Sequence, residues 1–223
     1  NELPYSLEFT NYGENKAYSA FADVTYAATE ALELTAGLRY IKEEKRSGYS
    51  SAAPNSVLTQ APLFTVDTNG ETFYGDADYD DWLPRFNALY IINPTTNMYA
   101  TVSKGRRSEV LEVSSANDEQ GSVEASISEV PAEIIWNYET GIKGKALDGR
   151  LDYSVAVFYQ DYSNFQVTLQ DDEGVAFSAD AGSATNVGAE AEVRALINNE
   201  FEVFANTAYL DAEIDDDSNN GNL

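Results

Sequence analysis

Apolar side chains recur at every second position on both sides of a short turn in YSAFADVTYAATEALELTAGLRYI, residues 18–41. The even positions from Tyr18 to Tyr26 and from Leu32 to Tyr40 are apolar or aromatic, whereas the odd positions between them are mostly polar. A period of two is that of a β-strand, whose successive side chains point to opposite sides. The segment therefore predicts two antiparallel strands with one apolar face, which meets either a protein core or lipid.

The same alternation returns along the chain and predicts about nine strands of roughly 10 to 14 residues. Soluble sheets typically use strands of about 5 to 6 residues, so this length needs a reason. The apolar positions are even up to residue 142 and odd from residue 151 onward. The expected strands are a weaker one near 3–10, then 18–26, 32–40, 82–92, 97–104, 134–143, 150–159, 186–195 and 201–209.

The connections alternate between short and long. Short turns are expected at 28–31, 93–96, 144–149 and 198–200. Long loops are expected from about residue 43 to 79 and from about 106 to 130, with a protruding hairpin near 171–174 and a further loop from 211 onward. In an antiparallel meander all the long loops then emerge at one end. This asymmetry is typical of outer-membrane barrels, with short periplasmic turns and long external loops.

A soluble β-sandwich also alternates, and it is the competing interpretation of any single strand. Against it, the strand length matches the roughly 9 to 11 tilted residues that cross a bilayer. Aromatic residues of the apolar face also recur eight positions apart, which spans about 20 Å of membrane normal, close to the apolar band between two aromatic girdles. We predict a lipid-facing aromatic girdle made of Tyr18, Tyr26, Trp82, Tyr90, Trp136, Phe201 and Tyr209.

The opposite face is too polar for a dry core. Within a sandwich its charged side chains would be buried and would each need a partner, whereas in a barrel lumen they meet water or a polar plug. The polar residues of this parity are Arg39, Arg85, Asn137, Glu139, Lys143, Arg150, Asp152, Glu190, Glu192, Arg194 and Asn206.

Composition excludes several functions. Thirty-eight Asp and Glu against 13 Lys and Arg leave a net charge of −25, which disfavours nucleic acid and anionic lipid as partners through long-range repulsion. The chain has no histidine and no cysteine, so the commonest general base, the Ser-His-Asp arrangement and thiolate chemistry are all missing. Glu190 and Glu192 share a face but are ordinary lumen lining beside Arg194, so we expect no enzyme, no catalytic residue and no cofactor.

Candidate ligand-binding residues lie in the external loops and on the inward face. Tyrosines can stack on an aromatic or catecholate ligand, and arginines can bind an anionic one. The alternative is that the arginines pair with lumen acids, a plug or lipopolysaccharide, and that the tyrosines pack the loops. The candidates are Arg39, Arg85, Arg106, Arg107, Tyr49, Tyr74 and Tyr79.

Two acidic tracts, residues 75–81 and 215–217, have the oxygen ligands that Ca²⁺ prefers. Asp215, Asp217 and Asn219 have the spacing of a calcium loop, but Asn220 stands where the turn glycine is needed and no ligating glutamate follows. As solvated external loops these tracts need no metal, and we expect none.

Four stretches resemble the barrel of TonB-dependent outer-membrane receptors. The most characteristic parts are a Gly-Leu-Arg-Tyr strand ending, a Leu-Pro-Arg strand opening, a Ser-Lys-Gly-Arg strand exit, a Tyr-Glu-Thr-Gly-Ile-Lys pattern and a late Gly-Ala-Glu-Ala-Glu strand. The stretches are residues 17–45, 80–107, 136–167 and 186–196.

The resemblance implies a Gram-negative outer-membrane receptor with a 22-stranded barrel around an N-terminal plug. Such a receptor imports a scarce nutrient complex, typically a ferric siderophore, with energy from the inner-membrane TonB complex. This chain shows neither plug nor coupling segment and ends in the polar tract DDDSNNGNL, so we expect residues 1–223 to be an internal barrel section, in contact with outer-membrane lipid and lipopolysaccharide. The alternatives are a small self-contained barrel, acting as porin or adhesin, and a soluble surface β-sandwich that binds carbohydrate or protein.

Overall fold

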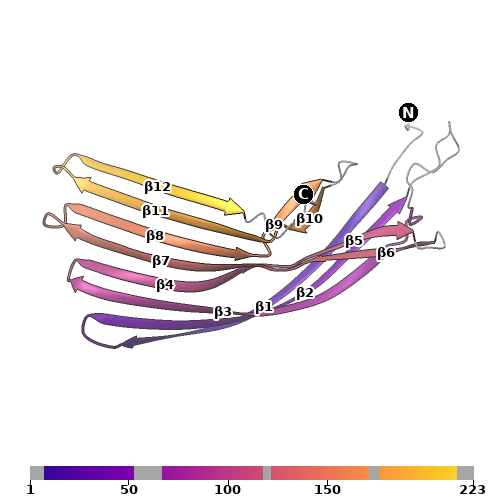
Figure 1. Ribbon diagram of the computed structural model, residues 1–223, viewed down its shortest axis with the longest axis horizontal. Coiled ribbons are helices and arrows are strands. Elements are labelled where there is room, and N and C mark those ends of the chain that lie inside the picture. The colour runs from indigo at the N-terminus through magenta and orange to yellow at the C-terminus, as the bar shows by residue number, and fades with distance from the viewer. Residues whose placement is uncertain (1–7, 53–66, 118–121, 171–175, 215–223) are drawn as a thin grey trace. The chain divides into compact units, whose positions relative to one another are not determined.

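The structure is a computed structural model that describes residues 8–52, 67–117, 122–170 and 176–214, where strands and turns make up the fold (Figure 1). No helix in these ranges is long and apolar enough to cross a membrane. The strands are β1 (Glu8–Ala27), β2 (Leu32–Ala52), β3 (Phe73–Asn93), β4 (Thr96–Arg107), β5 (Val110–Asn117), β6 (Val123–Val130), β7 (Glu133–Ala146), β8 (Leu151–Ser163), β9 (Gln166–Gln170), β10 (Ala176–Asp180), β11 (Ser183–Leu196) and β12 (Glu202–Ile214).

Eight strands hydrogen-bond into one sheet in the order β1-β2-β3-β4-β7-β8-β11-β12, while β5 with β6 and β9 with β10 form separate hairpins. From β3 onward the neighbours in the sheet pair antiparallel. The expected all-β antiparallel fold is therefore confirmed. Residues 8–10 of the strand expected near 3–10 belong to β1, which continues to Ala27, and residues 1–7 lie outside the described part of the chain.

The short turns are closed by local hydrogen bonds. Thr29, Asn93 and Asn198 each accept hydrogen bonds through a side-chain oxygen from backbone N–H groups two or three residues further on. In the remaining turn, Asp148 and Gly149 have φ of 57° and 80°, a left-handed conformation that these two residue types adopt more readily than most. All four turns lie at one end of the sheet, as the sequence predicted (Figure 1).

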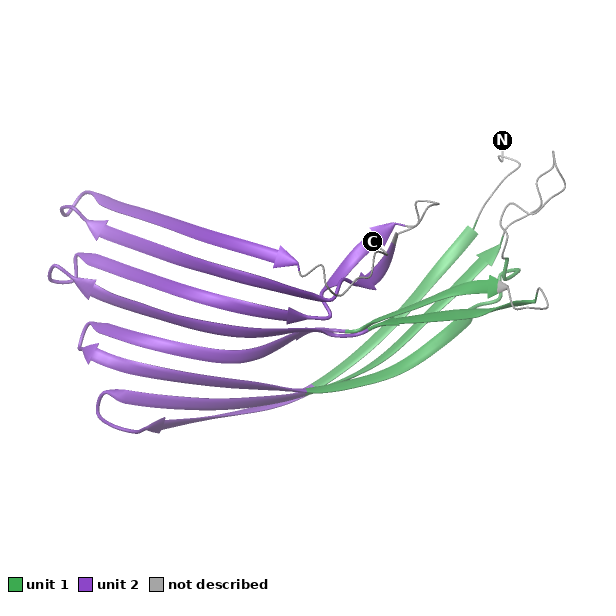
Figure 2. Ribbon diagram, viewed as in Figure 1, with its two compact units in different colours: residues 1–18, 41–81, 109–130 green, residues 19–40, 82–108, 131–223 purple. Residues whose placement is uncertain are grey.

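The chain divides into two compact units (Figure 2). Unit 1 consists of residues 1–18, 41–81 and 109–130, and unit 2 of residues 19–40, 82–108 and 131–223. The four short turns and the β9–β10 hairpin belong to unit 2, and the β5–β6 hairpin belongs to unit 1.

The register of unit 2 gathers its apolar residues on one side. Directly opposed residues of antiparallel strands point the same way, and Phe86 is opposite Val102, which is opposite Tyr138. Tyr138 in turn faces Tyr159, with ring centroids 6.1 Å apart. We call this side the apolar face. It comprises the even positions of β1, β2, β3, β4 and β7 and the odd positions of β8, β11 and β12.

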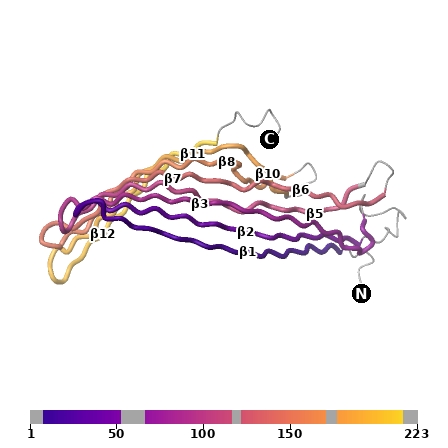
Figure 3. Tube along the Cα trace, turned by 90° about the horizontal axis from the view of Figure 1, so that it is seen from below, coloured from indigo at the N-terminus to yellow at the C-terminus, as the bar shows by residue number. Residues whose placement is uncertain are grey.

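The opposite side of unit 2, which we call the polar face, is crossed by hydrogen bonds between neighbouring strands. Asn87 donates to Thr101 over 2.7 Å, and Arg194 forms a 2.8 Å ion pair with Glu202. Strands of unit 2 lie side by side in one layer (Figure 3). In the described residues only five apolar side chains are buried: Leu111, Val113, Val130, Ala181 and Ala184. These ranges therefore contain no core between two sheets, which a β-sandwich would require.

Unit 1 has a small core where the β5–β6 hairpin packs on the sheet. Val113 and Ile127 of the hairpin cover Gly75, where a Cβ would stand 3.0 Å from Val113 and 3.3 Å from Ile127. Ser47 donates a 2.7 Å hydrogen bond to the Leu111 carbonyl, and Lys45 donates to the Glu109 carbonyl. The odd-numbered side of β2 and β3 in unit 1 is thus covered by the hairpin.

The expected long loops contain more β-structure than the alternation predicted. β2 runs to Ala52, β3 begins at Phe73, and the stretch around residues 110–130 forms the β5–β6 hairpin. The hairpin expected near 171–174 is present as β9 and β10, although its tip lies outside the described residues. The stretch expected to become a loop at residue 211 stays in β12 as far as Ile214, and the acidic tract that follows also lies outside them.

Candidate functional site

The polar face of unit 2 carries a hydrogen-bonded cluster around Tyr99. The Tyr99 phenol donates a 2.6 Å hydrogen bond to Oε1 of Glu139 on the neighbouring strand. The Lys143 ammonium lies 5.0 Å from the centroid of the same ring, a cation–π contact. The hydrogen bond thus ties Glu139 on β7 to Tyr99 on the neighbouring strand β4.

Beside this cluster the polar face is hollowed by about 560 Å³. Glu139, Glu190 and Glu192 line the hollow together with Phe158 and Asn206. Three carboxylates in one open hollow make it a negatively charged surface that favours cationic groups. Glu190 and Glu192 share this face as the sequence predicted.

Two inward arginines lie on the same face and are already paired. Arg85 Nη2 forms a 2.9 Å ion pair with Asp23, and Arg39 Nη2 donates a 3.1 Å hydrogen bond to Ser19. Gly37 leaves the space for the first pair, because a Cβ there would collide with the Asp23 carboxylate. The Arg85 side chain is 55% exposed and Arg39 is also an exposed residue. Both arginines therefore remain accessible from the polar face.

Arg106 and Arg107 point to opposite sides of β4. The register sets Arg106 against Ile134 in line with the apolar face, and sets Arg107 against Glu133, whose carboxylate is 4.0 Å from Nη1. Only Arg107 therefore lies with the inward arginines. Arg106 also interacts with other groups of the chain.

A buried glutamine joins the bases of the two hairpins next to Arg107. Gln166 Nε2 donates hydrogen bonds of 3.0 Å to the Ser108 carbonyl and 2.8 Å to the Pro131 carbonyl. The backbone N–H of Gln166 donates a hydrogen bond to the Glu133 carboxylate, and the residue is only 6% exposed. Sequence reasoning missed Gln166, because it lies outside the expected strands and a single glutamine carries no signal of its partners.

Tyr79 lies on the hairpin-covered side of unit 1. Its phenol donates a 3.1 Å hydrogen bond to Glu129, and the Lys45 ammonium is 6.0 Å from its ring centroid. Burial, followed by the hydrogen bond and the negative charge of Glu129, raises the pKa of Tyr79 above its usual value. Tyr49 has the same odd parity on β2 as Ser47 and so points to the same side.

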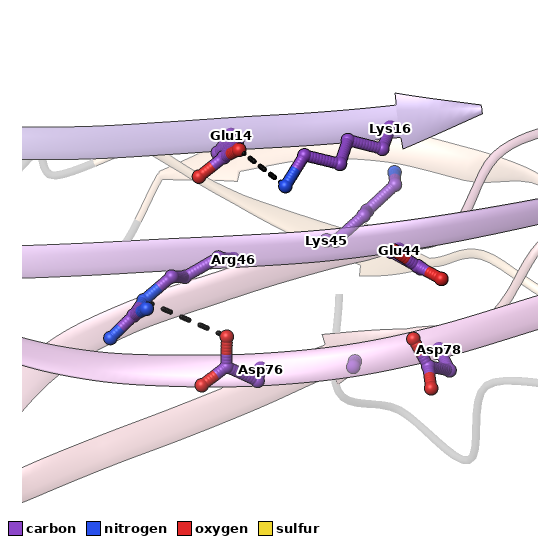
Figure 4. Close-up of a pocket in the computed structure, with 8 residues that line it drawn as sticks. Glu14, Lys16, Glu44, Lys45, Arg46, Asp76 and Asp78 are labelled. Atoms are coloured by element: carbon purple, nitrogen blue, oxygen red, sulfur yellow. Dashed lines mark ion pairs between the residues drawn. The ribbon is translucent and has the colours of Figure 1, made fainter.

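Tyr74 lies on the other side of unit 1, in a cluster with Tyr12 and Arg46. The Tyr12 and Tyr74 rings meet edge to face at 5.6 Å, and the Arg46 guanidinium lies 4.4 Å from the Tyr74 centroid. Next to them is an open groove of about 330 Å³, which we call the β1–β3 groove (Figure 4). It is lined by Glu14, Lys16, Glu44, Lys45, Arg46, Asp76, Ala77 and Asp78.

Ion pairs cross and border the β1–β3 groove. Lys16 Nζ is 2.8 Å from Glu14, and Arg46 Nε is 3.6 Å from Asp76 (Figure 4). The hydrogen bond between the first two raises the pKa of Lys16 and lowers the pKa of Glu14. Tyr12 also donates to Glu14 over 3.0 Å. The described ranges hold no group of three or more acidic side chains arranged to bind a metal ion by themselves.

Six of the seven predicted aromatic girdle residues are exposed, whereas Trp136 is half-buried, and Phe201 directly precedes β12. Tyr18, Tyr26, Trp82, Tyr90, Phe201 and Tyr209 are between 46% and 67% exposed. Trp82 meets Tyr40 at 4.8 Å, a neighbour that the prediction left out of the girdle. Trp136 is opposite Lys104 in the register.

The seven ligand candidates, in contrast, are divided between faces, and the structure does not gather them in one site.

A family model described as TonB dependent receptor-like, beta-barrel matches residues 2–223. Among curated proteins, the metal-pseudopaline receptor CntO of Pseudomonas aeruginosa is 26% identical over 136 residues, which is 61% of this chain and 17% of the relative. Among solved structures, the ferric yersiniabactin uptake receptor FyuA of Yersinia pestis has a TM-score of 0.73 at 19% identity, over 95% of this chain and 29% of that one. The ferric-catecholate import receptor Fiu of E. coli K12, in its closed form, has a TM-score of 0.65 at 20% identity, over 92% and 29%.

Proposed function

The chain belongs to the TonB-dependent receptor β-barrel family, and we propose that it forms part of the barrel wall of a receptor that imports a scarce nutrient complex. The family consists of transport receptors, not enzymes, and is located in the outer membrane of Gram-negative bacteria. The chain spans less than a third of the length of the relatives described above. In the proposal, residues 1–223 are a partial barrel, and a plug domain and further strands complete it.

The apolar face is proposed to meet lipid and the polar face to line the lumen. What supports this assignment is a one-layer sheet whose apolar side chains stay exposed, such as Phe86 at 55% and Val24 at 68%. A soluble protein rarely exposes so continuous an apolar surface. Outer-membrane lipid and lipopolysaccharide are then the partners of the apolar face and its aromatic girdle.

The proposed cargo is a metal complexed by a small organic chelator, with a ferric siderophore as the specific case. The names of FyuA and Fiu refer to ferric complexes, and that of CntO refers to metal-pseudopaline. The identity of the metal in the cargo is therefore a question for uptake experiments. Arg39, Arg85, Arg107, Tyr49 and Tyr79 are the candidates that the polar or hairpin-covered sides present to such a cargo. Arg106 and Tyr74 have outward parity and are not proposed as cargo ligands.

Energy for uptake is proposed to come from the inner-membrane TonB complex through the plug segment. The carboxylates around Tyr99 suit contact between the polar face and a plug inside the barrel, because they attract cationic groups of such a domain. The observation that carries the whole proposal is the division of a single-layer sheet into an apolar and a polar face, in a chain that matches the family over its length.

The test uses the full-length receptor in the bacterium that makes it. Outer-membrane fractions run with and without boiling should show a heat-modifiable band several times heavier than the 24.4 kDa of this chain. Under iron limitation, deletion of the receptor or of TonB should abolish uptake of the radiolabelled ferric siderophore. A band near 24.4 kDa would instead support the small barrel, and recovery in the soluble fraction alone would overturn the membrane assignment.

A double variant tests the cargo path. Arg39→Gln with Arg85→Gln should lower uptake of an anionic siderophore complex about tenfold, since each guanidinium offers charge-assisted hydrogen bonds. The matched control is Lys145→Gln with Arg150→Gln, which removes the same charge at the β7–β8 turn. Equal uptake by the double variant and the control would remove these arginines from the proposed cargo path.

A further inference from the structure

A row of uncharged polar side chains crosses the polar face of unit 2. Ser103 of β4 is opposite Asn137 of β7. Asn137 is in turn opposite Gln160 of β8, and Gln160 is opposite Asn186 of β11. Directly opposed residues of antiparallel strands point to the same side, so all four side chains stand on the polar face. We call these four residues the neutral row. Since neighbouring strands are about 4.8 Å apart, the row is roughly 14 Å long.

Hydrogen bonds hold the three amides of the neutral row together. Gln160 Nε2 donates to the Asn137 side-chain oxygen over 3.3 Å, and Gln160 Oε1 accepts from Asn186 Nδ2 over 3.2 Å. Tyr162, two residues along β8, donates a 3.3 Å hydrogen bond to the same Gln160 oxygen. Among the described residues, no further hydrogen bond engages the Asn137 amide nitrogen or the Asn186 side-chain oxygen. The row therefore offers one donor group and one acceptor to a ligand.

An aromatic ring lies beside the neutral row. Phe158 is two residues from Gln160 on β8 and so points to the same side. Gly188 of β11 is opposite Phe158, and a Cβ at this glycine would collide with the ring. The ring therefore occupies the space above Gly188, where no side chain covers it from that strand. A planar amide-type group can pack on such a ring while its polar atoms reach the row.

The surroundings of the neutral row disfavour anions. Glu139 is two residues from Asn137 on the same side of β7, about 7 Å along the strand. Glu139 lines the hollow on the polar face together with Glu190 and Glu192. These carboxylates repel a complex that brings several negative charges to the row, and the net charge of −25 adds repulsion at long range. A neutral complex experiences neither effect.

We propose that the neutral row selects the chelator of the cargo, and that it binds the amide-type groups of a ferric hydroxamate complex. This inference rests on the transport function proposed above. The Asn137 amide nitrogen donates to a carbonyl oxygen of the chelator, and the Asn186 side-chain oxygen accepts from an N–H group of its linker. Phe158 packs against the plane of the bound group. Three hydroxamates balance the charge of Fe³⁺ and give a neutral complex, whereas three catecholates leave a trianion.

The neutral row continues toward an arginine of the proposed cargo path. Arg85 of β3 is opposite Ser103, so a chelator that lies along the row places one end near the guanidinium. A single anionic group at that end pairs with Arg85, while uncharged groups hold the rest of the chelator. The arginine and the row thus recognise different parts of one cargo.

The test is calorimetric binding of two ferric complexes, a neutral trihydroxamate and a trianionic tricatecholate, to the purified full-length receptor in detergent. Wild type should bind the trihydroxamate more tightly. Asn137→Leu with Asn186→Leu should weaken that binding about tenfold, because polar atoms of the chelator lose their partners. Binding of the tricatecholate should stay at the wild-type level. The matched control, Asn87→Leu with Asn97→Leu, replaces two amides of the polar face outside the row and should bind like wild type.

Two kinds of outcome would overturn the proposal. Failure of wild type to bind the trihydroxamate, or tighter binding of the tricatecholate, would remove hydroxamates as the selected class. Equal binding of the trihydroxamate by wild type and the row variant, or an equal loss in the control, would remove the neutral row from recognition.

A smaller change guards against misfolding of the double variant. Asn137→Asp keeps the size of the side chain and the oxygen that accepts from Gln160, and it removes only the donor group. Heat-modifiability of each purified protein reports whether the barrel is folded. Folded Asn137→Asp should also bind the trihydroxamate more weakly, and binding at the wild-type level would contradict the donor role of Asn137.

Uptake by cells reports on the proposed function separately. Binding of the trihydroxamate without TonB-dependent uptake of either complex would contradict the transport role alone. TonB-dependent uptake of the tricatecholate, with no binding of the trihydroxamate, would leave the transport role standing and would contradict only the inference about the neutral row.

Discussion

Gly141 lies directly against Tyr99. A Cβ at position 141 would stand 2.8 Å from the Tyr99 phenol oxygen and 2.7 Å from the backbone carbonyl oxygen of Val155. The absence of a side chain at Gly141 therefore lets the phenol reach Glu139 on the polar face. This close approach connects a glycine inside a strand with the orientation of a carboxylate in the proposed lumen.

The first prediction concerns this glycine. Gly141→Ala should destabilise the folded receptor by about 1 to 3 kcal/mol, because one of the colliding atoms is backbone and cannot rotate away. Equilibrium unfolding by guanidinium chloride in detergent micelles measures the change. Gly13→Ala is the matched control, since a Cβ there meets nothing within 4 Å. If both variants unfold at the same denaturant concentration, the close approach at Gly141 is not as described.

The second prediction tests which face meets lipid. Leu34 lines the apolar face with Val24 and Phe86, while the neighbouring Thr35 hydroxyl lies 3.0 Å from that of Thr25. Leu34→Arg should block assembly, since an arginine near the middle of the membrane costs about 2 to 4 kcal/mol. Thr35→Arg should assemble, because position 35 lies on the polar face that is proposed to line the lumen. Heat-modifiable protein in the outer membrane measures both, and assembly of Leu34→Arg at the wild-type level would contradict the lipid assignment.

The strands and faces were predictable because a period of two is a local property of the sequence. Tyr18 to Tyr26 and Leu151 to Tyr159 alternate strongly enough to show parity without knowledge of their neighbours. The register was not predictable, so no cross-strand partner could be predicted either, for example Glu139 as the partner of Tyr99. The β5–β6 hairpin was missed because each of its strands is only eight residues long, and the sheet residues that it packs on, such as Gly75, are distant in the sequence.

The candidate ligand residues show the same limit. Arg106 and Arg107 are adjacent, so the sequence grouped them, but adjacent strand positions point to opposite sides. Tyr74 and Tyr79 are an odd number of positions apart on β3, so they too point to opposite sides. Placement in a loop was the signal used, whereas the structure extends β3 through both tyrosines and so fixes the side on which each one lies.

The third prediction concerns Gln166. Gln166→Ala leaves two backbone carbonyls at the base of the β5–β6 hairpin without their buried donor, and an unsatisfied buried polar group costs about 1 to 3 kcal/mol. We expect faster hydrogen exchange in peptides that contain residues 107–110 and 131–134, with the short turns unaffected. Gln170→Ala, at an exposed position of the same strand, is the control. Unchanged exchange on both sides of the β5–β6 hairpin base in Gln166→Ala would show that the glutamine does not join the two hairpins.

The final prediction uses the raised pKa of Tyr79. A raised pKa means that the neutral phenol is favoured in the folded protein, so this stabilisation is fully present below the unfolded tyrosine pKa, about 10, and is lost as pH rises through the folded value. The difference in phenolate absorbance between wild type and Tyr79→Phe should therefore stay near zero through pH 10 and appear only at higher pH. Glu129→Gln removes the charged acceptor and should move the appearance of that difference toward pH 10, since the hydrogen bond and the charge both raise the pKa. A wild-type difference with its midpoint near pH 10 would mean that the β5–β6 hairpin leaves Tyr79 open to solvent.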